Sequence, residues 1–239
     1  MKLKIPEIGY LVEIDEAHVT SLMFEEPSLF ARCVECIRMA CEGQYDDAFL
    51  WDDTKSLSLS KNSEIIFYPS LIDFNSRKIQ TALIRKLRQL NGIEIEKTNE
   101  LEEQIKSLRI HFDKFMGDVD LDYTYCDTPD LSAVLKFLDI SIAPEDCDIC
   151  NRVKEYLHVC SALGLSEYLF CFNFKSIFTK DEIADIELCA LQNGRKLVLL
   201  DHVSEACVSP YEKGIIITKE YDIAQLEGNH DSTLKYVFD

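Results

Sequence analysis

The sequence predicts an α/β protein: a mostly parallel sheet covered by helices on both faces, with a helical segment inserted into it. Apolar runs alternate with helical segments in the last third of the chain, which is typical of buried parallel strands. Earlier in the chain this alternation gives way to helical periodicity alone. The predicted boundaries are 1–72 for the first part of the α/β domain, 73–144 for the helical insertion and 145–239 for the second part of the α/β domain.

Length and composition are those of a globular protein. The 239 residues are 47% hydrophobic, which is enough to build a core. The N-terminus is interrupted by Pro6, Glu7, Gly9 and Glu13, so it has no apolar core of signal-peptide length. No later apolar run approaches the ~18 residues that span a bilayer. We therefore expect a cytoplasmic protein.

The first 72 residues combine short β-type runs with one helix. The helix is predicted over 28–41, with Ser28 as its N-cap after Pro27. Proline, glycine and acidic turns separate the runs before it. The β-type runs are 2–5, 10–14, 19–24 and, after the helix, 64–68.

A helix with two distinct faces is predicted over 75–90, with Asn75 as its cap. At about 100° per residue its apolar side chains fall on one arc, and most of its basic side chains share a neighbouring arc. The apolar residues are Ile79, Leu83, Ile84, Leu87 and Leu90, and the basic residues are Arg77, Lys78, Arg85, Lys86 and Arg88. One face is expected to pack and the other to bind an anion. The alternative is a basic face that is only solvated.

A second long helix is predicted over 100–116. Its apolar positions step by four, three, four and three residues, the spacing of a helix packed against another helix or a second subunit. These positions are Leu101, Ile105, Leu108, Phe112 and Phe115. A further helix is predicted over 130–138.

The last third returns to alternating helices and strands. Thr179 and Glu182 have the spacing of a capping box, which specifies the start of one of its helices. The predicted helices are 148–163 and 179–191, and the predicted strands are 168–174, 196–201 and 214–218.

An acidic segment follows the second long helix of the insertion. In an extended segment alternate residues point to the same side, so Asp118, Asp120 and Asp122 would present their carboxylates together. Hard, oxygen-seeking cations such as Ca²⁺ prefer this arrangement. We predict these three residues, with Asp127 and Asp130, as calcium ligands. The alternative is a solvated acidic turn.

The ten cysteines mostly sit among apolar residues, where a reduced thiol behaves as a small hydrophobic group. Two CxxC pairs, Cys33/Cys36 and Cys147/Cys150, leave open a four-thiolate zinc site. The pairs are far apart in the sequence and both lie in predicted helices. Buried thiols are therefore the favoured interpretation.

A formal net charge of −18 repels nucleic acid at long range. A role with nucleic acid therefore needs a segregated basic face, bound divalent cations, or an oligomer that gathers its positive side on an inner wall. None of the eight glycines lies in a GxxxxGK[ST] or GxGxxG motif, so the sequence predicts no phosphate-cradling loop and no ATP hydrolysis.

Several segments occur in a specific order. LFCFNFKS at 169–176 is followed by FTKDEI at 178–183, and further segments lie at 75–79, 135–138, 197–201 and 212–217. This ordered set resembles the ring-forming CRISPR adaptation (spacer acquisition) protein family of type II-A systems, over most of the chain. The family commonly mixes Glu with Asp in the acidic stretch, whereas this chain has Asp at all three alternating positions. Its tail after Tyr221 has no counterpart in the family.

The resemblance implies an α/β head, related to nucleotide-hydrolase folds but without a phosphate loop, and an inserted helical leg. It implies a homotetramer that closes into a ring, threads double-stranded DNA with a preference for ends, and uses bound Ca²⁺ to hold legs and ring in shape. The implied role in spacer acquisition is non-catalytic, beside the CRISPR integrase complex and the RNA-guided effector nuclease. The basic helix is the candidate inner wall, and 118–122 matches the calcium-binding region.

Two other functions remain open on the residues alone. Clustered carboxylates can hold two Mg²⁺ ions for phosphodiester cleavage, so Asp118, Asp120 and Asp122 would also suit a metal-dependent nuclease, with His111 and Lys114 as the nearest basic groups. The acidic surface would also suit an interaction module that binds basic partners and no DNA.

Overall fold

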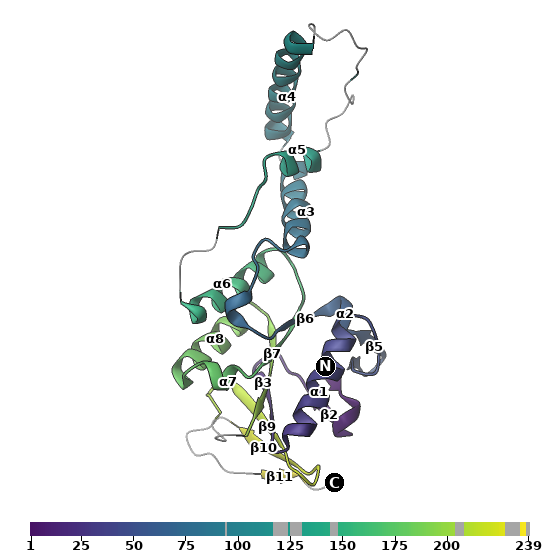
Figure 1. Ribbon diagram of the computed structural model, residues 1–239, viewed down its shortest axis with the longest axis vertical. Helices are drawn as coiled ribbons and strands as arrows, with labels where there is room; N and C mark the ends of the chain where they lie inside the picture. The colour runs from purple at the N-terminus through teal and green to yellow at the C-terminus, as the bar shows by residue number, and fades with distance from the viewer. Residues whose placement is uncertain are drawn as a thin grey trace. The chain divides into compact units, whose positions relative to one another are not determined.

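Figure 1 shows the computed structural model of the chain, which describes residues 1–93, 95–116, 124, 131–143, 148–203, 208–227 and 235–237. The chain divides into two compact units. Unit 1 comprises Met1–Ile72 and Pro144–Asp239, and unit 2 comprises Asp73–Ala143. The fold is α/β, as the sequence predicts, with one mixed sheet and one antiparallel sheet.

Unit 1 is built on a seven-stranded sheet in the order β11-β10-β9-β3-β8-β7-β6. The strands from β9 to β6 are parallel to one another, whereas β10 and β11 are antiparallel additions at one edge. The sequence predicts the parallel strands but neither β10 nor β11. The strands are β3 (Val19–Phe24), β6 (Ser63–Ile66), β7 (Tyr168–Phe172), β8 (Lys196–His202), β9 (Glu212–Ile217), β10 (Ile223–Glu227) and β11 (Lys235–Val237).

A second, antiparallel sheet in the order β2-β1-β4-β5 also belongs to unit 1. Its first two strands, β1 (Lys2–Lys4) and β2 (Leu11–Glu13), are the first two predicted β-type runs. The other two, β4 (Phe49–Asp52) and β5 (Lys55–Ser58), form a hairpin that the sequence does not predict. The hairpin turn places Asp53 at a φ of 27°.

Helices cover both faces of the larger sheet (Figure 1). On one face, α1 (Pro27–Cys41) packs over a core that includes Leu22 and Leu200. On the other face lie α6 (Ile149–Ala162), α7 (Phe174–Ile177) and α8 (Lys180–Gln192). The remaining described elements of unit 1 are η1 (Pro6–Ile8), α2 (Leu59–Asn62) and η2 (Pro69–Leu71).

The structure shows the N-caps of two helices whose caps the sequence predicts, α1 and α8. The capping box at α8 is confirmed: the Glu182 amide donates to Thr179 Oγ1 at 3.4 Å, and the Thr179 amide donates to Glu182 Oε2 at 2.8 Å. The cap of α1 is predicted wrongly. Pro27 occupies the first turn, where a missing amide costs nothing, and Glu26 rather than Ser28 is the N-cap. Its side chain accepts from the Ser28 amide at 3.3 Å.

Unit 2 consists, in its described part, of α3 (Arg77–Ile93), α4 (Ile95–Met116) and α5 (Leu131–Phe137). Ile79 and Ala82 are buried on the packed side of α3, as its apolar arc predicts. The predicted seam of α4 is only partly covered, because Leu108 and Phe112 each remain 48% exposed. A surface of this kind suits packing against a second copy.

The described cysteines are free thiols. Cys33 and Cys36 lie on α1 and Cys150 lies on α6, on opposite faces of the larger sheet. Burial raises the pKa of Cys33 and of Cys36 to about 12, which keeps both thiols protonated. These positions do not support the four-thiolate zinc site. Among the described residues, no helix is long and apolar enough to cross a membrane.

Candidate nucleic-acid interface

The basic residues of α3 lie in a stretch free of acidic residues. Residues 74–93 contain five Lys and Arg and neither Asp nor Glu, in a chain whose formal net charge is −18. The units share this charge unequally. Unit 1 carries 30 Asp and Glu against 15 Lys and Arg, a net −15, whereas unit 2 carries 13 against 10, a net −3. Unit 2 is therefore the part of the chain that repels a polyanion least.

The predicted basic arc is exposed. At about 100° per residue, Arg77, Lys78, Arg85 and Arg88 fall within roughly 100° of the helix surface, and Lys86 lies a further 80° or so away. All five side chains are exposed. Among the described residues, Arg85 and Arg88 have no carboxylate partner, so their guanidinium groups can bind phosphate without first breaking an ion pair.

A shallow groove of about 520 Å³ runs between α3 and α5. Arg85 and Arg88 line it from α3 and Lys136 lines it from α5. The other lining residues are Thr81, Ile84 and Gln89, so none of the described residues that line the groove is acidic. Three cations around one groove can hold a phosphate backbone, because Arg binds phosphate in a bidentate manner and Lys acts as a point charge.

The sequence does not predict Lys136 as a binding residue. Its helix is predicted, but nothing local in the sequence says that this helix packs beside α3, which ends at Ile93. The five predicted basic residues and Lys136 together are called the α3 cationic face. The groove unites Arg85, Arg88 and Lys136, while Arg77, Lys78 and Lys86 lie outside it.

The predicted calcium ligands Asp118, Asp120, Asp122, Asp127 and Asp130 all lie outside the described residues. Their arrangement therefore stays a prediction. Within the described part of the chain, no group of three or more His, Cys, Asp and Glu side chains is placed to hold a metal ion.

A second candidate site lies in unit 1, on the face of the larger sheet covered by α8. Glu187, Asp201 and Glu212 are buried there, and the side chain of Lys175 is 13% exposed. The Lys175 ammonium donates to Glu212, and the Lys175 amide donates to Asp201 Oδ1 at 2.9 Å. The Ser209 hydroxyl donates to Glu187. These contacts tie α7, α8, β8 and the start of β9 together.

The buried position of these carboxyls changes their protonation. Burial raises the pKa of Glu187 to about 8, and the negative charge of Glu212 contributes. Burial likewise raises the pKa of Asp201 to about 6, although the Lys175 amide and ammonium oppose the shift. Glu187 is thus mostly protonated at neutral pH. One feature of the sequence indicates that Glu187 is buried: at helical spacing it lies on the same side of α8 as the buried residues Ile183 and Ala190.

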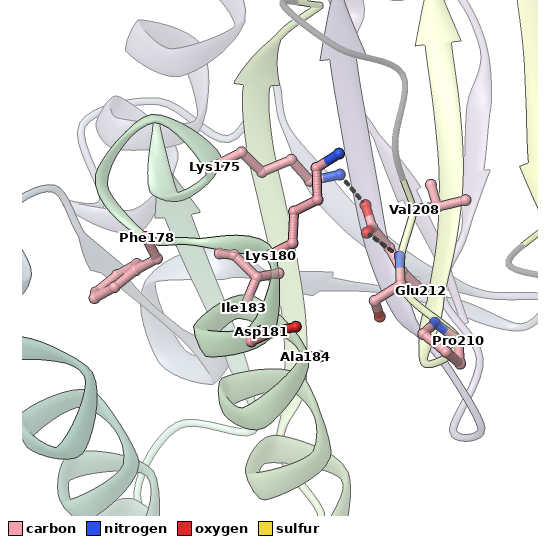
Figure 2. A pocket seen from close by; sticks show the side chains of 10 residues that line it. Lys175, Phe178, Lys180, Asp181, Ile183, Ala184, Val208, Pro210 and Glu212 are labelled. Carbon is pink, nitrogen blue, oxygen red and sulfur yellow. Dashed lines mark hydrogen bonds and ion pairs between the residues drawn. The ribbon is translucent and has the colours of Figure 1, made fainter.

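Figure 2 shows the pocket next to this cluster, with a volume of about 460 Å³. Lys175 and Lys180 extend toward Glu212, and Phe178 and Val208 form part of the apolar wall. Among the described lining residues, two lysines stand against two carboxylates, those of Asp181 and Glu212. The pocket therefore attracts a polyanion less strongly than the α3 cationic face does.

The fold and the surface define a class of protein: an α/β unit without a glycine-rich phosphate loop, combined with a helical unit that presents an exposed cationic face. A family model described as CRISPR-associated protein (Cas_Csn2) matches residues 41–221, more than half of the chain. The chain therefore belongs to this CRISPR-associated family of type II-A adaptation proteins, which confirms the resemblance seen in its ordered segments. None of the curated proteins matches the chain.

Proposed function

We propose that the protein binds double-stranded DNA in CRISPR spacer acquisition, as a non-catalytic ring of four copies that admits DNA ends and uses Ca²⁺. The observation that carries the DNA contact is the α3 cationic face: six exposed Lys and Arg side chains, three of them around one groove, on the unit that holds little net charge. Family membership supplies the adaptation role.

The contact is with phosphates and not with bases. Lys and Arg that neutralise phosphates release condensed counterions, which gives sequence-independent and salt-dependent affinity. Arg85 and Arg88 are one helical turn apart, so both can contact the same strand of the backbone. A surface of this kind lets DNA slide, which suits a protein that encircles duplex and reads no sequence.

The half-exposed seam of α4 supports an oligomer. Leu108 and Phe112 would bury their free surface against another copy. Size-exclusion chromatography with light scattering is expected to give four copies in millimolar calcium. A monomer under that condition would contradict the ring.

Calcium is proposed from the spacing of Asp118, Asp120 and Asp122, with Asp127 and Asp130 as further ligands. Ion binding to these carboxylates would neutralise their mutual repulsion and so stabilise the folded protein. Chelation is therefore expected to lower the melting temperature, and calcium to restore it. A melting temperature that does not respond to either addition would contradict the proposal.

The decisive comparison uses one DNA molecule in two forms. Linear duplex is expected to bind in the presence of Ca²⁺, whereas the same molecule as a covalently closed circle binds far less well, because a closed ring needs an end. Cutting the circle once should restore binding. Equal binding of both forms would contradict threading, and no binding of either would contradict the DNA role. Cleavage products with Mg²⁺ that disappear in Asp120→Ala would instead support the nuclease.

A second candidate, recruitment of basic proteins, is favoured by an acidic groove of about 500 Å³ on unit 1. Glu7, Glu35 and Asp47 line it together with Tyr45, and Arg32 is the one basic side chain among its described lining residues. A lysine-rich peptide tests this candidate by calorimetry. Binding that is lost in Glu7→Gln/Asp47→Asn would support it, and peptide binding unaffected by these changes would count against it.

A further inference from the structure

Asn75 does not act as the predicted helix cap; its side chain pairs with the returning chain of unit 2. Its Oδ1 accepts from the Ile142 amide at 2.8 Å, and its Nδ2 donates to the Ile142 carbonyl at 3.0 Å. The Gln80 Nε2, from the first turns of α3, also donates to Asn75 Oδ1 at 3.0 Å. These three hydrogen bonds, here called the Asn75 clasp, fix Ile142 to the start of α3.

The clasp is placed where it limits the position of α5. A rise of 1.5 Å per residue puts Arg85 about 12 Å along α3 from Arg77, the first residue of the helix after Asn75. The five residues from Phe137 to Ile142 span at most about 17 Å when fully extended. Fixing Ile142 at Asn75 therefore keeps the end of α5 within about 17 Å of Asn75, which limits how far α5 can move along α3.

The end of α5 shortens this connection further. The Leu138 amide donates to the Val134 carbonyl at 3.0 Å and the Asp139 amide donates to the Lys136 carbonyl at 3.1 Å. Asp139 has a φ of 49°, the left-handed conformation that ends helices. Residues 138 and 139 thus turn instead of extending, so the connection from Lys136 to the clasp is shorter than a fully extended chain.

We propose that Asn75 is a positioning residue for DNA binding: the clasp sets the place of Lys136 beside Arg85 and Arg88, and so completes the groove. This inference rests on the proposed contact between the α3 cationic face and DNA. It differs from a general stabilising role, because it assigns the effect of Asn75 to one particular cation.

A double-mutant cycle tests the assignment. The slope of log Kobs against log salt for a linear duplex is measured for wild type, Asn75→Ala, Lys136→Ala and the double variant. In each single variant the slope is expected to become less negative by about 0.9, the value of one phosphate contact. In the double variant the change of slope is expected to be no larger than in either single variant. Full additivity of the two losses, or a wild-type slope in Asn75→Ala, would overturn the inference.

Asn62→Ala is the matched control, because it removes a hydrogen bond from an Asn Nδ2 to a backbone carbonyl, that of Ser58, in unit 1. It is expected to keep the wild-type slope. Hydrogen exchange should show the Ile142 amide protected in wild type and exposed in Asn75→Ala while α3 stays protected, which separates release of the clasp from unfolding. Absence of DNA binding by the wild type would contradict the proposed function. Normal DNA binding without coupling between Asn75 and Lys136 would contradict only the positioning role of Asn75.

Discussion

Replacing Arg85 and Arg88 together by alanine is expected to weaken DNA binding by a predictable amount. Both side chains are exposed, both line the groove, and neither has a carboxylate partner among the described residues. Their loss should leave the fold intact, because the buried side of α3 is formed by Ile79 and Ala82 instead. The change therefore acts on phosphate contacts alone.

The magnitude follows from counting cations. If each of the six cations of the α3 cationic face meets one phosphate, the slope of log Kobs against log salt is about −5 per copy bound, at roughly −0.9 per contact. The double variant removes two contacts, so its slope should be shallower by about 1.8. At 0.15 M salt the same two contacts correspond to roughly a thirtyfold loss of affinity, or about 2 kcal/mol.

Fluorescence anisotropy with a labelled linear duplex, titrated from 50 to 300 mM salt, measures both quantities. The charge-matched control is Lys55→Ala/Lys61→Ala, which removes two exposed lysines from unit 1. The control should keep the wild-type slope. A slope that changes equally in both double variants would show that net charge, and not the α3 cationic face, sets the affinity.

Three further predictions concern unit 1. Because Glu187 has a folded pKa of about 8 against an ordinary value of 4.5, the folded state keeps a proton that the unfolded state loses, so stability falls as pH rises from 4.5 to 8, by at most about 1.4 kcal/mol per pH unit. Glu187→Gln should flatten this dependence in urea titrations at pH 5.5, 7 and 8, and an unchanged pH dependence would contradict the buried cluster. Gly214→Ala places a methyl group 2.5 Å from Val208 Cγ1 and 2.9 Å from Met23 Cε, so the urea midpoint should drop by an amount worth about 1–3 kcal/mol; a neutral result would mean that this part of β9 is packed differently. Thr179→Ala should cost about 1 kcal/mol through loss of the α8 cap, whereas Ser28→Ala should be nearly neutral, because Glu26 caps α1; equal losses would refute these cap assignments.

Periodicity and turn chemistry predict much of the fold. The arcs of α3, the capping box at Thr179 and the apolar parallel strands are local signals, and the structure has a helix or a strand at each of them. The hairpin of β4 and β5 is not predicted by the sequence, and the structure pairs its strand β4 with β1, almost fifty residues earlier in the chain. A strand that depends on a distant partner leaves little trace in its own sequence.

The site residues that the sequence predicts also depend on local patterns, whereas those it does not predict depend on contacts between distant segments. Arg77, Lys78, Arg85, Lys86 and Arg88 are recognisable because one helix carries them all. Lys136 and Asn75 act through residues far away in the chain, and Lys175 meets Glu212 only because α7 and β9 lie on the same sheet. Such pairings follow from topology, which no local pattern specifies.

Lysine labelling tests the central claim most directly. The assembly is acetylated with and without a short linear duplex in calcium, and each lysine is quantified by mass spectrometry. Protection of Lys78, Lys86 and Lys136, with Lys55 and Lys61 unchanged, is the predicted outcome. Protection confined to the lysines of unit 1, or no protection at all, would contradict DNA binding through the α3 cationic face.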